Sequence, residues 1–164
     1  MAMENNNYVY LSGPMAGLSF EEALNGWRKT AAARLIDHDI IGLNPGRGKE
    51  DTLKEVKDLP KIGIVGKGLL ATNKGITVRD YYDLKRSQFM LLNLTGAKAV
   101  GIGSMIEVGW AHALGIPIIL VMEEYFNIHE HAILNSLVSI RTQSLDEALG
   151  YIISCVDTDC QYSY

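Results

Sequence analysis

Residues 101–122 read Gly-Ile-Gly-Ser-Met-Ile-Glu-Val-Gly-Trp-Ala-His-Ala-Leu-Gly-Ile-Pro-Ile-Ile-Leu-Val-Met. The apolar spacing predicts a helix over residues 104–114, with Gly115 placed to end it, and an uninterrupted apolar strand over residues 116–122. A strand with no polar face is typical of a parallel sheet that helices cover on both sides. Glu107 is the one carboxylate in this helix. A charge among so many apolar neighbours requires a structural or a chemical reason.

The rest of the chain repeats this alternation. Strands are predicted over residues 8–11, 40–44, 97–101 and 138–141, and helices over residues 19–37, 77–92 and 144–155. Such alternation indicates βαβ units. We therefore expect an α/β fold with one doubly wound, flavodoxin- or Rossmann-like parallel sheet of about five strands and helices on both faces. A length of 164 residues suits a single domain over residues 1–164.

Residues 46–76 do not fit the alternation, and we interpret them as a variable insertion or mobile loop with a short charged helix over residues 50–59. The run Gly-Ile-Val-Gly-Lys-Gly at residues 63–68 suggests a phosphate loop. However, Lys61 and Gly68 stand where that motif needs a glycine and a serine or threonine, which argues against it.

The composition excludes several classes of function. A formal net charge of −4 and a pI near 5.5 leave no basic field for a nucleic-acid partner. The sequence has neither a signal-peptide pattern nor a run of about 18 apolar residues, so no membrane partner is expected. Two cysteines give no disulfide framework. We expect a soluble, cytoplasmic protein. No motif implies a metal or an organic cofactor, and the four histidines are expected at the surface or in a subunit contact.

Ligands of doubly wound sheets bind beyond the carboxyl ends of the strands. The loops over residues 12–17, 44–48 and 101–107 are therefore expected to face one crevice. Two acidic residues, Asp80 and Glu107, open helices on that side. Each follows a hydroxyl residue by three positions, as in a capping box, so helix capping is one interpretation. Glu107 also has glycines and apolar residues around it. Such surroundings suit a carboxylate that attacks an electrophilic carbon, so catalysis is the second interpretation.

Three segments together resemble the nucleoside 2-deoxyribosyltransferase family, which includes related nucleoside 5′-monophosphate N-glycosidases. They are residues 101–119, with a glycine turn followed by Glu-Val-Gly-Trp-Ala; residues 9–15, Val-Tyr-Leu-Ser-Gly-Pro-Met; and residues 79–94, which begin Arg-Asp-Tyr-Tyr-Asp. They occur in the family's order and leave out chiefly residues 46–76 and the C-terminal tail.

The resemblance implies a role for each matching position. Glu107 would be the nucleophile that attacks C1′ of the sugar, Asp80 would contact the base and help protonate it, and Tyr10 would orient Glu107. The further positions implied to lie against substrate are Ser12, Gly13, Pro14, Met15, Asp83, Asn93, Gly103 and Ser104. Asp83 is the weaker alternative to Asp80. Gln88 stands where the family often has aspartate, and residues 100–103 lack an acidic residue that some members carry.

The resemblance leaves the acceptor open. A transferase passes deoxyribose to another base, whereas a hydrolase of 2′-deoxynucleoside 5′-monophosphates passes it to water and needs phosphate donors, for which Arg47 and Arg79 are the candidates. We favour the transferase; a nucleotide-binding module without catalysis is the third alternative. The implied partners are a nucleoside or nucleotide and a nucleobase. The resemblance also implies a homo-oligomer with shared active sites, for which Tyr125, Phe126 and the tail at residues 162–164 are candidate contacts.

Overall fold

The computed structural model describes residues 6–15, 18–19, 21–47 and 72–161, with side chains as far as residue 157. The helix predicted over residues 50–59 and the glycine-rich run at residues 63–68 lie outside these ranges, as do Ala16 and Gly17 of the first loop. None of the described helices combines the length and the apolar character that crossing a bilayer requires.

The sheet has five strands: β1 (Asn7–Ser12), β2 (Ile40–Leu43), β3 (Phe89–Asn93), β4 (Ile118–Val121) and β5 (Ile140–Thr142). Their order is β2-β1-β3-β4-β5, and every neighbouring pair is parallel. The prediction of a parallel, doubly wound sheet is thereby confirmed. The order reverses between β1 and β3, and it is there that sheets of this topology bind ligands.

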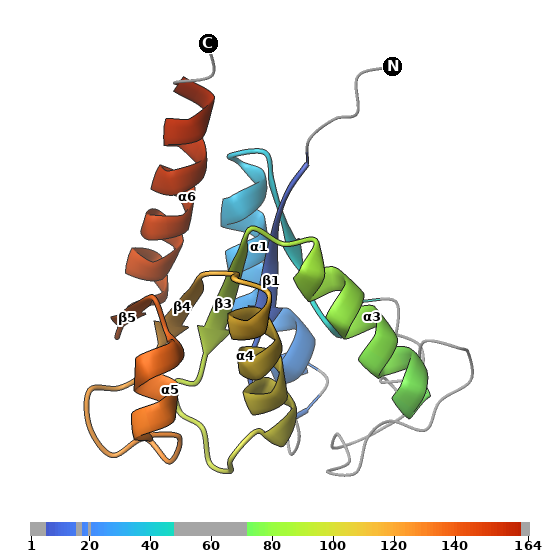
Figure 1. Ribbon diagram of the computed structural model, residues 1–164, viewed down its shortest axis with the longest axis vertical. Helices are drawn as coiled ribbons and strands as arrows, with labels where there is room; N and C mark the ends of the chain where they lie inside the picture. The colour runs from blue at the N-terminus through green and yellow to red at the C-terminus, as the bar shows by residue number, and fades with distance from the viewer. Residues whose placement is uncertain (1–5, 16–17, 20, 48–71, 162–164) are drawn as a thin grey trace.

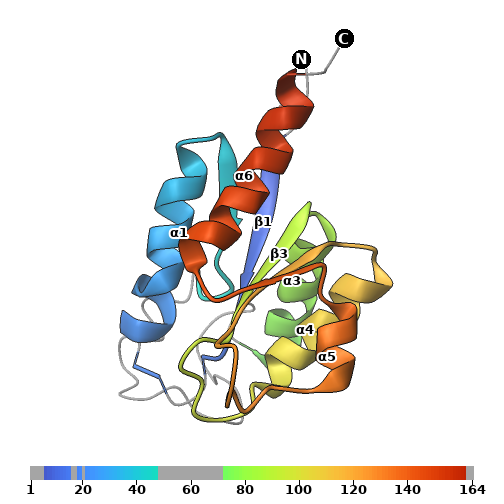
Figure 2. The same cartoon turned by 90° about the vertical axis from the view of Figure 1, so that its left-hand side faces the viewer.

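Helices cover both faces of the sheet (Figure 1). They are η1, a turn of π-helix (Glu21–Asn25), α1 (Trp27–Ile36), α3 (Asn73–Lys85), α4 (Ile102–Ala113), α5 (Ala132–Leu137) and α6 (Leu145–Gln161). Figure 2 shows α1 and α6 on one side of the strands and α3, α4 and α5 on the other.

Alternation along β1 divides the core in two. Val9 and Leu11 pack in the cluster under α1 and α6, while Tyr10 packs in the cluster under α3, α4 and α5. The layers approach closely at Gly42, where a Cβ would lie 3.2 Å from the Cα of Ala32 on α1. Helix α4 ends at Ala113 with Leu114 as its C-cap, and the predicted terminating glycine, Gly115, follows with a φ of +70° that suits glycine.

The third strand was predicted in the wrong place. Residues 97–101 form part of the turn-rich connection from β3 to α4, and the strand is Phe89–Asn93, which was assigned to the end of a helix. Met90, Leu91 and Leu92 are fully buried, and periodicity alone does not separate a short, wholly apolar strand from a buried helical turn.

Two helix boundaries also differ from the prediction. The side chain of Thr72 caps α3 by accepting a hydrogen bond from the Gly75 N–H, so α3 begins within the stretch interpreted as an insertion. Arg47, at the other end of that stretch, closes a turn onto the Asn44 carbonyl. The helix predicted over residues 19–37 is divided at Gly26 into η1 and α1, although the predicted Ser19 and Glu22 capping box is present.

Candidate active site

Glu107 lies in the second turn of α4 and reaches across to the carboxyl end of β1. The hydroxyl of Tyr10 donates a hydrogen bond to Oε1 at 2.8 Å, and the hydroxyl of Ser12 donates to Oε2 at 2.6 Å. Tyr10 and Ser12 are fully buried, whereas Glu107 keeps some exposed surface. Both carboxylate oxygens are therefore fixed by rigid strand residues at the point where the strand order reverses.

Helix capping does not explain the two acidic residues. The N-cap of α4 is Gly101, with no side-chain cap, and Ser104 lies inside the first turn. Asp80 is likewise in the middle of α3, because Thr72 caps that helix and the Thr77 hydroxyl donates to the Asn73 carbonyl. The capping interpretation is wrong for both, so their carboxylates need another explanation.

The surroundings of Glu107 work against its charge. Burial is the main cause that raises the pKa of Glu107 to about 7, and the negative charge of Asp80 adds to it. The hydrogen bonds from Ser12 and Tyr10, and the positive charge of Arg28, favour the carboxylate. Burial also raises the pKa of the Tyr10 phenol well above its ordinary value, with Glu107 as the next cause. Tyr10 is consequently a hydrogen-bond donor to Glu107 at neutral pH.

Asp80 lies close to this group from α3, on the same side of the sheet. Its side chain is buried, and its Oδ1 is 2.9 Å from Nη2 of Arg79. Arg79 is buried too, and its guanidinium also donates to the carbonyls of Pro45 and Arg47 in the turn after β2. Asp80 and Glu107, the two acidic residues that the sequence indicated, therefore interact electrostatically in the structure.

Asp83 serves a different cluster. It is fully buried, and its Oδ2 lies 2.5 Å from Nη2 of Arg47 and 3.9 Å from Nε of Arg79, while its Oδ1 lies 2.8 Å from Nη2 of Arg86. These pairs bind α3 to the turn after β2. Asp83 therefore has no surface to offer a ligand.

The other residues predicted to contact substrate lie in or near the loop that follows β1. Gly13 fits tightly, because a Cβ there would lie 2.5 Å from the carbonyl oxygen of Asn93. Pro14 lies beside Gly101, whereas Met15 packs against Ala23 and Leu24. The Asn93 side chain accepts a hydrogen bond from the Thr95 N–H. Gly103 has open space around it.

Arg28 is a residue of this region that the sequence interpretation missed. It lies on α1, is 1% exposed, and donates hydrogen bonds to the carbonyls of Leu11, Gly13 and Ala23 at 3.1, 2.7 and 2.7 Å. An arginine in an amphipathic helix is ordinarily a solvent-facing residue. The ring centroid of the neighbouring Trp27 lies 4.7 Å from the guanidinium carbon, but the sequence gives no signal of this contact.

The nucleoside 2-deoxyribosyltransferase family model matches residues 9–137, most of the chain. The chain belongs to the nucleoside 2-deoxyribosyltransferase family. It is accordingly an enzyme of nucleoside or nucleotide N-glycosyl chemistry, a transferase or a glycosidase. No curated protein was found to match this member of the family in sequence.

Solved structures of deoxyribosyltransferases share its fold at low sequence identity. The 2-desoxiribosyltransferase from Leishmania mexicana has a TM-score of 0.59 at 15% identity, covering 90% of this chain and 97% of its own. The 2-deoxyribosyltransferase from Bacillus psychrosaccharolyticus has 0.58 at 16%, covering 88% and 91%. The CMP N-glycosidase BcmB from Clostridium botulinum has 0.54 at 18%, covering 89% and 97%.

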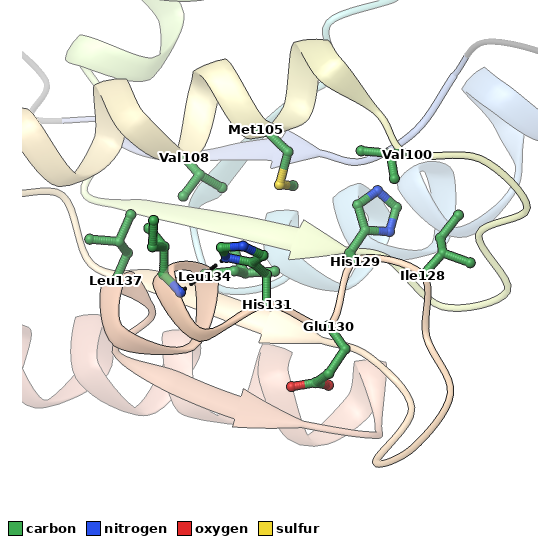
Figure 3. A pocket seen from close by; sticks show the side chains of 10 residues that line it. Val100, Met105, Val108, Ile128, His129, Glu130, His131, Leu134 and Leu137 are labelled. Atoms are coloured by element: carbon green, nitrogen blue, oxygen red, sulfur yellow. Dashed lines mark hydrogen bonds between the residues drawn. The ribbon is translucent and has the colours of Figure 1, made fainter.

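This deoxyribosyltransferase-family chain also has an apolar pocket of about 350 Å³ between α4 and α5 (Figure 3). Met105 and Val108 point into it from α4, toward Leu134 and Leu137 on α5. Its other lining residues are Val100, Ile128, His129, Glu130, His131 and Ile133. Glu107 does not line this pocket, so it is separate from the group around Tyr10 and Ser12.

His129 joins that pocket to the start of α4. It is 4% exposed, contrary to the surface position expected for the histidines, and its Nε2 accepts a hydrogen bond from the Gly101 N–H at 3.0 Å. Its Nδ1 lies 3.1 Å from Oδ1 of Asn127, which assigns the proton to Nδ1 in the neutral ring. Burial lowers the pKa of His129. The first turn of α4 is therefore held by a neutral histidine.

Proposed function

We propose that the chain is a nucleoside 2-deoxyribosyltransferase that transfers 2-deoxyribose between nucleobases through a covalent intermediate on Glu107. The observation that carries this proposal is the Glu107 carboxylate, bound by Tyr10 and Ser12 at 2.8 and 2.6 Å beside the carboxyl end of β1. Two oriented donors fix the attacking group, and its partial burial limits the hydration that would weaken a nucleophile.

The proposed reaction has two displacements. In the first, a carboxylate oxygen of Glu107 forms a bond to C1′, the bond from C1′ to the base nitrogen breaks, and the electron pair stays on the base, which takes up a proton from solvent through Asp80. In the second, a nitrogen of the acceptor base attacks C1′, the bond to Glu107 breaks, and the acceptor's proton returns to solvent through Asp80. Two easier steps replace one difficult substitution.

The engagement of the arginines favours a nucleoside over a 5′-monophosphate. Phosphate binding needs donors that are available to the ligand. Arg79 is buried and donates to Asp80 and to two carbonyls, and Arg47 pairs with Asp83 and donates to the Asn44 carbonyl. Both phosphate candidates are thus occupied in holding α3 to the turn after β2.

The test supplies the purified chain with a 2′-deoxynucleoside, with and without a second free base, and follows products by chromatography. We expect a new deoxynucleoside only when the second base is present. Release of base without an acceptor, with a preference for deoxynucleoside 5′-monophosphates, would instead establish the hydrolase. Tight binding of either ligand without turnover would establish a binding module.

The covalent role of Glu107 has its own test. Glu107→Gln keeps the size of the side chain but removes the nucleophile, so we expect the transfer rate to fall at least about a thousandfold. Asp80→Asn is expected to lower it by roughly a hundredfold or more, because proton transfer to the base is lost. Glu147→Gln, an exposed position on α6 across the sheet, is the matched control and should leave the rate unchanged.

Mass spectrometry of the quenched wild-type reaction adds direct evidence. We expect a deoxyribosyl adduct on the peptide that contains Glu107 and none in Glu107→Gln. A Glu107→Gln variant with full activity would refute the mechanism, whatever the acceptor is.

A further inference from the structure

Arg28 is a buried charge whose hydrogen bonds surround the β1 loop. Its Nε donates to the carbonyl of Leu11, immediately before Ser12, and its Nη2 donates to the carbonyl of Gly13, immediately after Ser12. Its Nη1 donates a hydrogen bond to the carbonyl of Ala23 in η1. One planar guanidinium therefore fixes the backbone on both sides of the residue that donates to Glu107 Oε2.

The backbone at Gly13 is closely packed. A side chain at Gly13 would meet the Asn93 carbonyl on one side at 2.5 Å and Nη2 of Arg28 on the other at 3.3 Å. Trp27 lies against the guanidinium of Arg28 and limits the movement of the guanidinium. The direction of the Ser12 hydroxyl is thus set by the position of Arg28.

The charge of Arg28 is not balanced by an adjacent carboxylate among the described residues, since its three hydrogen bonds all go to backbone carbonyl groups. Burying a cation without a counter-charge is costly. Burial accordingly lowers the pKa of Arg28 to about 10, and the charge of Glu107 is the main influence that opposes this shift. The same attraction acts in reverse on Glu107.

We infer that Arg28 is a positioning residue for the reaction proposed for Glu107: it holds the backbone on both sides of Ser12 and supplies the buried positive charge that favours the Glu107 carboxylate. The inference rests on the proposed function. The groups that face Glu107 are Tyr10 and Ser12 from β1, Asp80 from α3 and Arg28 from α1, and Arg28 is the one cation among them. Asp80 opposes the carboxylate, and Arg28 acts in the opposite direction, after the hydrogen bonds from Ser12 and Tyr10.

The first test measures the ionisation of Glu107 without any substrate. The protein is labelled with ¹³C at the glutamate carboxyl carbons, the Glu107 signal is assigned by its loss in Glu107→Gln, and its chemical shift is followed against pH. In Arg28→Gln we expect the midpoint to rise by about one pH unit, because a favourable charge is lost. Arg34→Gln is the control and should not move it, because Arg34 is a partly exposed residue of the same helix that pairs with Asp146.

The second test separates charge from geometry. Arg28→Lys keeps the positive charge but lacks the planar fork that reaches three carbonyls. We expect its Glu107 midpoint to stay near the wild-type value while kcat for transfer falls roughly tenfold or more at every pH, with KM little changed, because Ser12 is no longer held in place. In Arg28→Gln the loss of kcat should be about tenfold greater at pH 6 than at pH 9, following the one-unit shift.

The outcomes decide the inference in every case. An unchanged midpoint in a folded Arg28→Gln variant would overturn the electrostatic part, and wild-type kcat in Arg28→Lys would overturn the positioning part. If Arg28→Gln does not fold, Arg28→Lys decides alone, because a purely structural arginine would give wild-type kcat once the variant has folded. If the proposed function is wrong, the wild type fails to transfer the sugar, yet the carboxyl titration still reports on Arg28.

Discussion

Folding makes the Glu107 carboxylate harder to ionise. Its pKa rises from an ordinary value of 4.5 to about 7, with burial as the largest cause, although two hydroxyl groups donate to it. The folded chain therefore binds this proton more tightly than the unfolded chain does. The resulting stabilisation is fully present below about pH 4.5 and is lost as the pH rises through about 7.

Glu107→Gln should consequently stabilise the protein at alkaline pH. The variant carries no charge to bury, so its free energy of unfolding should exceed that of the wild type by up to about 3 kcal/mol at pH 8, with a much smaller difference at pH 5. Urea unfolding at the two pH values measures this, with Glu147→Gln as the control. A difference that does not change with pH would contradict the assignment of a raised pKa to Glu107.

A site residue could be predicted from the sequence where its side chain differs in character from its neighbours in the chain. Glu107 was conspicuous because it interrupts an apolar helix. The structure brings it to Tyr10, the residue that the resemblance implied would orient it, and also to Ser12, which was expected only as a substrate contact. Arg28 was missed because nothing local distinguishes a buried arginine from an exposed one. Its partners are carbonyl groups 5, 15 and 17 residues away, and backbone acceptors leave no mark in a sequence.

Helix α4 is fixed at two points, and these have opposite responses to pH. Glu107 connects it to β1, and the His129 imidazole accepts a hydrogen bond from the Gly101 N–H at its start. Protonation of His129 at Nε2 would replace this acceptor with a second donor. Since burial lowers the pKa of His129, its contribution to stability is present above about pH 6.5 and is lost as the pH falls below that value.

His129→Leu is expected to leave the Gly101 N–H without its acceptor. The free energy of unfolding should fall by about 1 to 3 kcal/mol at pH 7.5, and the variant should lose less stability than the wild type on going to pH 5.5. Chemical denaturation at both pH values tests this. His112→Leu, an exposed position on α4, is the control. Equal acid sensitivity of His129→Leu and the wild type would show that His129 does not hold the helix.

Asp83 anchors α3 through its pairs with arginines. Asp83→Asn removes a fully buried charge that faces three arginines, so we expect a loss of about 2 kcal/mol or more in the free energy of unfolding. Asp146→Asn, whose ion pair with Arg34 is on the surface, should leave the melting temperature unchanged. If both variants melted like the wild type, the arginine cluster would have no structural role.

Elements were predictable from the sequence where their pattern was long or bounded by clear signals. The helix before Gly115 and the apolar strand after it were located to within two residues. The third strand was not, because Phe89–Asn93 follows α3 after three residues and its apolar side chains extend the helical spacing of Val78, Tyr81 and Leu84. The helix caps were predicted wrongly because hydroxyl residues at the spacing of a capping box also occur inside helices, as Thr77 and Ser104 do.

For the whole molecule, the alternation of strands and helices was sufficient to predict a parallel sheet. It was not sufficient to locate the subunit contact that the resemblance implies, because such a contact depends on surfaces that only the fold assembles. Tyr125 and Phe126 follow β4 and are 66% and 100% exposed. Phe126 has a φ of +64°, which is strained for a bulky side chain and holds its ring out in solvent.

We predict that this aromatic pair lies in a contact between subunits. Replacing both with serine should shift the protein toward monomers in sedimentation velocity and lower the transfer rate per chain, because the family resemblance implies shared active sites. Ile36→Ser, which removes an exposed apolar side chain from α1, should leave the sedimentation unchanged. Identical sedimentation of the doubly substituted and wild-type proteins would place the contact elsewhere.

The hydrogen bond from Ser12 to Glu107 joins residues 95 apart in the chain, whereas Arg28 reaches Leu11 across only 17. Short loops close at a smaller entropic cost than long ones. On the ribosome, β1 and Arg28 are made before α4, so the segment that carries the two hydroxyl donors is complete before Glu107 is added. The hydrogen bond between Ser12 and Glu107 can therefore form only after α4 has been made.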